Sequence, residues 1–252
     1  VEQRLGHRLA AADDQRRAAL GGFAQGGFGG FYRRIRGGVA LGRIAKAIGK
    51  GLDAFPQQGV GTVVLTPHFY RDREEPQHFL TRRASAAQAL AAAIKALPEP
   101  EQNALPRLAL GAEIAWVPHL ADWPELPELC LGTSAYFLLE LPFYPWTDQL
   151  INQLYELPGR TGLTPVLAHI ERYLRSQKPQ YLEAVLDLGF PVQVSAEPLL
   201  HLTQRGPVLR LLRTHRAQLV ASDAHDPTTR PPNLGEAFQL LRRKLGEEKS
   251  NY

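Results

Sequence analysis

The sequence has only one cysteine, Cys130, among its 252 residues. A single thiol excludes an internal disulfide framework, and it is compatible with a reducing cytoplasm. It also excludes a zinc cluster built from several cysteines. We therefore interpret Cys130 as a small buried apolar residue rather than as a functional thiol.

Long apolar runs are lacking as well. No run approaches the length of a membrane span, and the start of the sequence shows no apolar core of a signal peptide. We therefore expect a cytoplasmic protein without a membrane span. The formal net charge is a mild +4, and residues 1–50 account for the excess, with ten Lys and Arg against three Asp and Glu. The charge therefore says little about the partner of the remaining chain.

Residues 1–50 differ in character from the rest of the chain. The stretch from Gly21 to Gly38 is glycine-rich and basic with interspersed phenylalanines, and it shows neither strand alternation nor a sustained helical stripe. Such a composition occurs in flexible binders of single-stranded nucleic acid, but a poorly ordered tail is the favoured interpretation. We expect an atypical Gly/Arg-rich segment at 1–50 that is poorly ordered, followed by one domain at 51–252.

From residue 51 onward, short apolar runs alternate with helical patterns, which is typical of an α/β domain. Strands are expected at 62–65, 108–114, 136–141, 164–169, 191–195 and 219–221. Helices are expected at 81–97, 147–157, 179–188, 207–216 and 233–245. The segments 70–79 and 98–106 are expected to be loops. Asn233 and Glu236 have the spacing of a capping box for the last helix.

Most of these strands carry a metal-donor side chain at or near the C-terminal end. An isolated His or Glu is usually structural, but a repeated placement over five strands is hard to assign to chance. Parallel α/β barrels gather their chemistry at this end of the strands, so the donors should meet at one rim. Nitrogen and oxygen donors suit Mn, Fe or Zn, and this number of them predicts two or more ions. The donors are His68, Glu113, Glu140, His169, Asp223 and His225.

Two arginines follow the donors closely in the sequence. Arg172 lies three residues after His169, and Arg230 lies five residues after His225 and is followed by two prolines that stiffen the backbone. Arginine presents a rigid fork of donors that matches an oxyanion, most naturally a phosphate. We predict that Arg172 and Arg230 are phosphate clamps flanking the metal cluster.

Five ordered motifs carry a family resemblance, and they read TPH, GAEI, LLELPF, AHIERY, and SDAH followed by RPP. The segment from about Leu52 to the C-terminus resembles the PHP superfamily. More closely, it resembles the CpsB/YwqE-type manganese-dependent protein tyrosine phosphatases of bacterial capsule and exopolysaccharide loci.

The resemblance implies a PHP-type distorted (β/α)7 barrel with a trinuclear metal centre. The implied metal is Mn²⁺, with Fe or Zn as alternatives, in two to three ions if the site is complete. The implied catalytic and substrate-binding residues are Arg172 and Arg230. The implied substrate is the phosphotyrosine-rich C-terminal tail of a bacterial tyrosine kinase that controls polysaccharide export. The implied metal ligands are His68, Glu113, Glu140, His169, Asp223 and His225.

The chain departs from the family pattern at two places. Ile170 stands where the family motif AHPERY has proline, which suggests a local turn adjustment with the ligand kept. The family also opens with an Asp-x-His-x-His strand that supplies two ligands, and no such motif exists here. The first strand of the barrel is therefore expected to be missing or replaced. We hypothesise that residues 1–50 are an altered or out-of-frame start; a degenerate family member is the other explanation.

Metal-dependent hydrolysis of phosphotyrosine is the first choice of function. A cysteine-dependent phosphatase is excluded, because it needs an arginine six positions after its nucleophile and Tyr136 stands there after Cys130. A PHP phosphoesterase acting on a small ester such as histidinol phosphate is the second choice. A catalytically impaired PHP module that only binds a partner is a third, and nucleic-acid binding by residues 1–50 is the least favoured.

Overall fold

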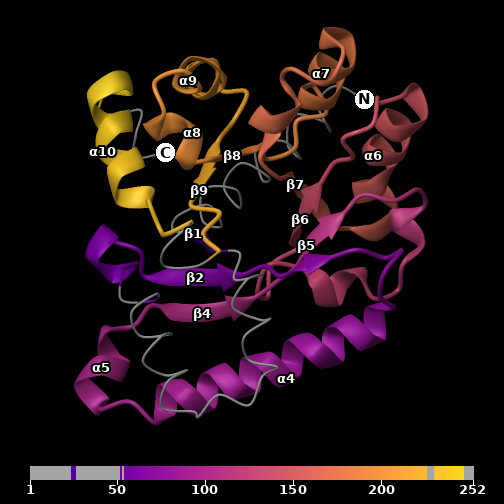
Figure 1. Cartoon of the computed structure of the whole chain (residues 1–252). Coiled ribbons are helices and arrows are strands. Elements are labelled where there is room, and N and C mark those ends of the chain that lie inside the picture. Colours follow the sequence, from indigo (N-terminus) through magenta and orange to yellow (C-terminus); the bar gives the residue numbers. More distant parts are fainter. Residues whose placement is uncertain (1–23, 27–51, 53, 226–229, 247–252) are drawn as a thin grey trace, which may run out of the picture.

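The computed structural model describes residues 24–26, 52, 54–225 and 230–246 (Figure 1). Every strand pairing among these residues is parallel, as expected for an α/β domain whose helices connect successive strands. The strands form three sheets, with the orders β1-β2-β4, β3-β5-β6-β7 and β8-β9. The strands are β1 (Ala24–Gly26), β2 (Thr62–Leu65), β3 (His68–Phe69), β4 (Arg107–Leu110), β5 (Glu113–Ala115), β6 (Tyr136–Glu140), β7 (Thr164–Leu167), β8 (Gln193–Ser195) and β9 (Leu219–Ala221).

Two of the expected strands are broken near their C-terminal ends. Pro67 separates β2 from β3, because proline cannot donate to a ladder. Gly111 separates β4 from β5, and a Cβ at this position would lie 2.9 Å from Leu131 Cδ2. The Glu113 amide nevertheless donates to the Pro67 carbonyl at 3.1 Å, so the two broken strands remain paired across their kinks. Each break lies just before a predicted metal donor, which is His68 in β3 and Glu113 in β5.

The strands follow one another around the molecule in the order of the sequence. If β2 and β3 are counted as one strand, and β4 and β5 as another, the nine described strands reduce to seven parallel strands, as predicted for a (β/α)7 arrangement. An isolated parallel bridge between Leu167 and Val192 connects β7 to the segment that leads into β8. β1 lies beside β9, so the last described strand is next to the first (Figure 1).

The position of the expected first strand is occupied by β1. Its residues Ala24 to Gly26 pair in parallel with Val63 to Leu65 of β2. None of these three residues carries an imidazole or a carboxylate. The first strand is therefore replaced rather than absent, and its replacement lacks the donor types of an Asp-x-His-x-His motif. The rest of the prediction that residues 1–50 are poorly ordered falls outside the described residues.

Helices surround the strands (Figure 1). Helix α4 begins at Pro76, five residues earlier than predicted, with the proline at a first-turn position that suits its fixed φ. Helix α5 occupies part of a segment predicted to be a loop, and Asn233 makes no side-chain capping bond, so both of these predictions were wrong. The helices are α4 (Pro76–Lys95), α5 (Glu99–Ala104), α6 (Asp148–Thr161), α7 (Pro179–Leu186), α8 (Glu197–Leu200), α9 (Arg205–Arg213) and α10 (Leu234–Leu245), with 3-10 turns η1 (Pro56–Gln58), η2 (Leu120–Asp122), η3 (Leu126–Leu129) and η4 (Ile170–Tyr173).

The main core lies between the β3-β5-β6-β7 sheet and the helices that cover it. Trp146, Tyr173 and Phe137 are among its largest fully buried side chains. Cys130 belongs to this core and is 4% exposed, which confirms its interpretation as a buried apolar residue. No helix of the described residues is both long enough and apolar enough to cross a membrane.

The Cys130 thiol should be unreactive in the folded protein. Burial raises its pKa to about 11, so little thiolate exists at pH 8. We expect alkylation of the native protein by iodoacetamide at pH 8 to be at least about a hundredfold slower than alkylation of the urea-unfolded protein. Mass spectrometry of timed samples measures both rates. Similar rates in the two states would contradict the burial.

Candidate metal centre

Four predicted donors meet beside the β3-β5-β6-β7 sheet, with His68 and Glu113 at the starts of β3 and β5, just after the breaks that follow β2 and β4. The β3–β5 register places His68 opposite Glu113, and Glu140 is the last residue of β6. His169 follows β7, and its Nε2 lies 3.0 Å from Glu113 Oε1 and 3.3 Å from Glu140 Oε1. One donor atom each from His68, Glu113 and Glu140 lie within 4.8 Å of one another. This donor cluster matches the rim predicted from the strand ends.

Two members of the donor cluster are buried, and hydrogen bonds join one of its histidines to its carboxylates. Glu113 and His169 are 5% and 2% exposed. Burial opposes protonation of His169, but hydrogen bonds to Glu113 and Glu140 outweigh it and raise the pKa of His169 to about 9. Burial likewise favours the neutral form of Glu140, but the hydrogen bond and charge of His169 hold the Glu140 pKa below its usual value. Without a metal, the centre is therefore an imidazolium held between two carboxylates.

The donor cluster fits a divalent metal ion. His169 Nδ1 is buried and has no hydrogen-bond partner. His68 Nδ1 is also buried without a hydrogen bond, although Glu113 Oε1 lies 3.5 Å from it. Buried polar atoms without a partner call for an explanation, and a bound ion is one. Two imidazoles with two carboxylates form a donor set that suits Mn, Fe or Zn. An ion that replaced the His169 proton would also satisfy the two negative charges beside it.

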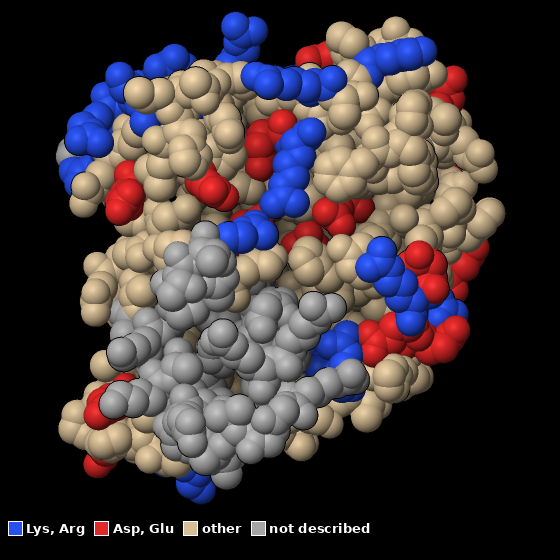
Figure 2. Space-filling model, in the orientation of Figure 1, with Lys and Arg blue, Asp and Glu red and all other residues tan. Residues whose placement is uncertain are grey.

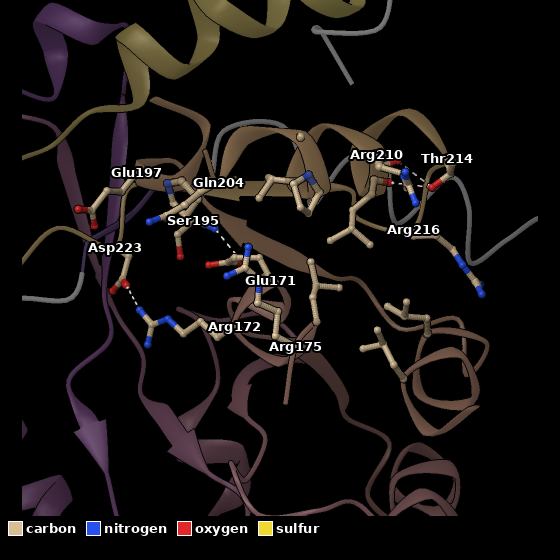
Figure 3. A pocket seen from close by; sticks show the side chains of 18 of the residues that line it. Glu171, Arg172, Arg175, Ser195, Glu197, Gln204, Arg210, Thr214, Arg216 and Asp223 are labelled. Atoms are coloured by element: carbon tan, nitrogen blue, oxygen red, sulfur yellow. Dashed lines mark hydrogen bonds and ion pairs between the residues drawn. The ribbon is translucent and has the colours of Figure 1, made fainter. Parts of the chain in front are cut away.

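The remaining predicted site residues form a second cluster, around Asp223. Arg172 Nη2 donates to Asp223 Oδ2 at 2.7 Å (Figure 3), and Arg230 donates to the same oxygen. His225 Nδ1 lies 3.6 Å from Asp223 Oδ1, and its Nε2 lies 3.1 Å from Arg230 Nη1. A predicted metal ligand and both predicted phosphate clamps are thus joined in one ion cluster. The sequence placed these residues together but did not indicate that the arginines would bind the aspartate.

The two clusters adjoin each other. The rings of His68 and His225 have centroids 5.8 Å apart. Within the part of the chain that the structure describes, the group with the spacing of an ion site contains His68, Glu113 and Glu140 but not Asp223 or His225. The eight predicted residues therefore occupy one region, with the metal donors on one side and the arginine–aspartate cluster on the other.

Two of the predicted ligands have a backbone conformation that is uncommon for residues other than glycine. His169 has φ +34° and Asp223 has φ +48°. Left-handed conformations of such residues cost free energy and persist only where the surroundings hold them. The buried Gln193 side chain accepts the His169 amide at 2.9 Å, which holds the turn after β7. Both turns aim a donor side chain at the rim.

Sequence reasoning missed three neighbours of the centre. The Tyr70 ring stacks on His68 with centroids 5.8 Å apart, and burial together with Glu140 and Glu113 raises the pKa of Tyr70. The Tyr173 hydroxyl donates to the Leu141 carbonyl at 2.6 Å. The Ser195 hydroxyl is buried without a partner. Tyr70 and Tyr173 lie two and four residues after predicted ligands, and this closeness in the sequence could have indicated that they are neighbours of the centre.

A family model described as "Capsular polysaccharide synthesis, CpsB/CapC" matches residues 47–252. This chain belongs to the CpsB/CapC family. The match spans all eight predicted site residues, and it begins after β1. The resemblance inferred from the five motifs is confirmed.

Curated relatives of this CpsB/CapC chain are named tyrosine-protein phosphatases. "Tyrosine-protein phosphatase CpsB" of Streptococcus agalactiae is 26% identical over 208 residues, covering 77% of this chain and 81% of the relative. "Tyrosine-protein phosphatase YwqE" of Bacillus subtilis is 28% identical over 197 residues, covering 76% of this chain and 74% of the relative.

Solved structures show the same fold. The structures described as YwqE from Bacillus subtilis and CpsB from Streptococcus pneumoniae, "unique metal-dependent tyrosine phosphatases", match with a TM-score of 0.67 at 25% identity, covering 82% of both chains. A variant of organophosphorus hydrolase from Deinococcus radiodurans matches with a TM-score of 0.51 at 13% identity, covering 91% of this chain and 89% of the other. The second likeness concerns the fold alone. Both support the PHP-type arrangement expected for a CpsB/CapC protein.

Proposed function

We propose that this chain is a metal-dependent phosphatase that hydrolyses phosphotyrosine on protein. The observation that carries the proposal is the donor cluster at the strand ends with the arginine–aspartate cluster beside it, in a chain of the CpsB/CapC family. The first cluster offers nitrogen and oxygen donors for cations. The second offers two guanidinium forks for a phosphate. Their adjacency suits a phosphoryl group held between metal and arginine.

The residues that would hold the metal are His68, Glu113, Glu140 and His169. Asp223 and His225 would be further ligands when Arg172 and Arg230 bind the substrate phosphate instead of Asp223. We propose Mn²⁺, in two to three ions if the ligand set is complete, with Fe or Zn as alternatives. The chemistry that such ions supply when bound is a nucleophilic hydroxide at neutral pH and positive charge toward the phosphoryl oxygens.

The protein's own groups orient and bind the substrate. Arg172 and Arg230 both donate to one oxygen of Asp223, so they already point at an anionic group in the place where a phosphate would bind. A phosphoryl group that takes over these donors frees the Asp223 carboxylate for a cation. The arginines then stabilise negative charge as the bond from phosphorus to the tyrosine oxygen breaks. No covalent enzyme intermediate is needed.

The proposed substrate is the tyrosine-phosphorylated C-terminal tail of a bacterial tyrosine kinase in capsule or exopolysaccharide synthesis, and the proposed setting is the cytoplasm. Two aromatic side chains near the centre support an aromatic ester. Phe143 and Tyr144, which follow β6, are 56% and 55% exposed, and Phe143 stacks on Tyr173 with centroids 5.2 Å apart. Exposed aromatic side chains are suited to contact a tyrosine ring.

The test compares two phosphate esters. We expect kcat/KM for a phosphotyrosine peptide to exceed that for histidinol phosphate by at least about tenfold. Inorganic phosphate release measures both reactions in the presence of Mn²⁺. A preference for histidinol phosphate would overturn the protein substrate and favour a small-ester phosphoesterase.

One observation favours a second candidate function. Because β1 carries no imidazole or carboxylate, a catalytically impaired module that binds its partner without hydrolysis remains the alternative. Elemental analysis of the purified protein separates the two. Two or three equivalents of Mn, Fe or Zn per chain support the phosphatase. Less than one equivalent, even after dialysis against Mn²⁺, supports the impaired module.

A further inference from the structure

A long groove leads away from the arginine–aspartate cluster. It has a volume of about 1250 Å³ and is lined by residues from η4, α7, α8 and α9. Figure 3 shows Arg172 and Asp223 near one end, and Arg210 and Thr214 toward the other. Pockets for a drug-sized ligand measure about 300–1,000 Å³, so the groove is larger than one phosphotyrosine side chain needs. It has room for the residues that flank the phosphotyrosine.

Of the four acidic residues that line the groove, two are paired with arginines. Glu183 pairs with Arg216, and Asp223 pairs with Arg172 and Arg230. Glu171 Oε2 accepts the Ser195 amide at 3.3 Å. Glu197 lies 3.7 Å from His201 Nε2. A backbone amide carries no charge and His201 carries one only when protonated, so Glu171 and Glu197 keep negative charge in the groove.

Two of the lining arginines have no such partner. Arg175 follows η4, and Arg210 lies on α9. Their guanidinium groups make no hydrogen bond or ion pair with the rest of the described residues, and both residues are exposed. Figure 2 shows blue and red side chains next to one another around the hollow on this face. The groove therefore offers, beside its carboxylates, two guanidinium groups that no described carboxylate occupies.

We propose that this groove binds the polypeptide around the phosphotyrosine and that Arg175 and Arg210 select an anionic residue in it, either a carboxylate or a second phosphate. The inference rests on the proposed phosphatase function. A guanidinium without a partner binds either anion with charge-assisted hydrogen bonds. Arg172 and Arg230 hold the phosphate that is to be removed, whereas Arg175 and Arg210 distinguish one phosphotyrosine sequence from another.

The experiment uses three versions of one phosphotyrosine peptide, with Ala, Glu or a second phosphotyrosine at the flanking positions. In the wild-type chain, we expect the Glu or the doubly phosphorylated peptide to have a kcat/KM about tenfold above that of the Ala peptide. The difference should lie in KM. The larger of the two gains identifies the preferred anion. If neither anion improves on Ala, the proposal is overturned.

The variant R175Q/R210Q should remove that preference. Its kcat/KM for the preferred peptide should fall about tenfold, while kcat for that peptide and turnover of p-nitrophenyl phosphate stay within twofold of wild type. The control is R213Q, which removes one positive charge from α9 outside the groove, as R210Q does within it, and it should change none of these values. Equal losses for the Ala and anionic peptides would overturn the selection by charge.

A binding measurement separates this inference from the proposed function. The same peptides carrying a phosphonomethyl analogue of phosphotyrosine cannot be hydrolysed, and fluorescence anisotropy gives their Kd. A wild-type preference for the anionic analogue that R175Q/R210Q abolishes supports the groove even if no ester is turned over. Turnover of every phosphotyrosine peptide without any preference supports the phosphatase and overturns the groove.

Discussion

Replacing His169 by glutamine lowers phosphotyrosine turnover by about a thousandfold, a loss of about 4 kcal/mol of transition-state stabilisation. His169 Nε2 is within 3.3 Å of carboxylate oxygens on both Glu113 and Glu140, so the substitution removes the donor that faces both acids. We expect less than half of the wild-type metal content by elemental analysis. The matched control is H201Q, in an exposed histidine 3.7 Å from Glu197, which should keep both activity and metal. Full metal content with full activity in H169Q would contradict the assignment.

The same substitution tests the charge of His169 in metal-free protein. H169Q leaves two buried carboxylates without their cation, which should lower the free energy of unfolding by about 3 kcal/mol in urea titrations with a chelator present. The folded pKa of His169 is raised to about 9, above an unfolded value of about 6.5. Its contribution is therefore complete below pH 6.5 and is lost as the pH rises through 9. The difference in the free energy of unfolding between wild type and H169Q should therefore decrease as the pH rises from about 6.5 to about 9. An increase over this pH range would contradict a cationic His169.

The order of strands and the donors at their ends could be predicted from sequence, because each strand is a short apolar run that stops at a polar side chain. Strand β9, with Asp223 and His225 following it, shows this most clearly. Alternation of such runs with helical patterns indicates a parallel α/β fold before any contact is known. The convergence of His68, Glu113, Glu140 and His169 then follows from the geometry of parallel strands.

The kinks and the first strand could not be predicted in the same way. At Gly111, where the strand breaks, a Cβ would lie 2.9 Å from the Leu131 side chain, and sequence patterns do not show this closeness of residues 20 positions apart. The three residues of β1 are too few to show alternation, so their pairing with β2 depends on tertiary context. The start of α4 at Pro76 was missed because a charged loop and a first helical turn have similar compositions.

The pairing of Arg172 and Arg230 with Asp223 could not be predicted from the sequence either. Residue type predicts that Arg172 and Arg230 bind an anion, but it does not say which anion binds when no substrate is present. The structure shows that Asp223, 9% exposed, is that anion. A buried carboxylate needs a partner, and both guanidinium groups reach Asp223, Arg172 from η4 and Arg230 from the segment after β9.

Replacing Arg230 by alanine should lower kcat/KM for a phosphotyrosine peptide by about a hundredfold to a thousandfold, because a preorganised donor to the phosphoryl oxygens is lost. R172A should have a similar effect. R230K keeps the charge but loses the fork, so it should recover only part of the activity. Arg160, which pairs with the exposed Asp122, supplies the control, and R160A should stay within twofold of wild type.

Metal content separates a phosphate clamp from a structural support of the ligands. In R230A, Arg172 still donates to Asp223 Oδ2 at 2.7 Å, so the carboxylate keeps a partner and the turn after β9 should hold. We therefore expect R230A to bind as much Mn²⁺ as wild type, and at least as tightly, because one competitor for the Asp223 oxygen is gone. The affinity for inorganic phosphate, measured as inhibition, should weaken with the activity. If R230A lost its metal together with its activity, Arg230 would be a support of the metal centre, and the assignment of its guanidinium to the substrate phosphate would be wrong.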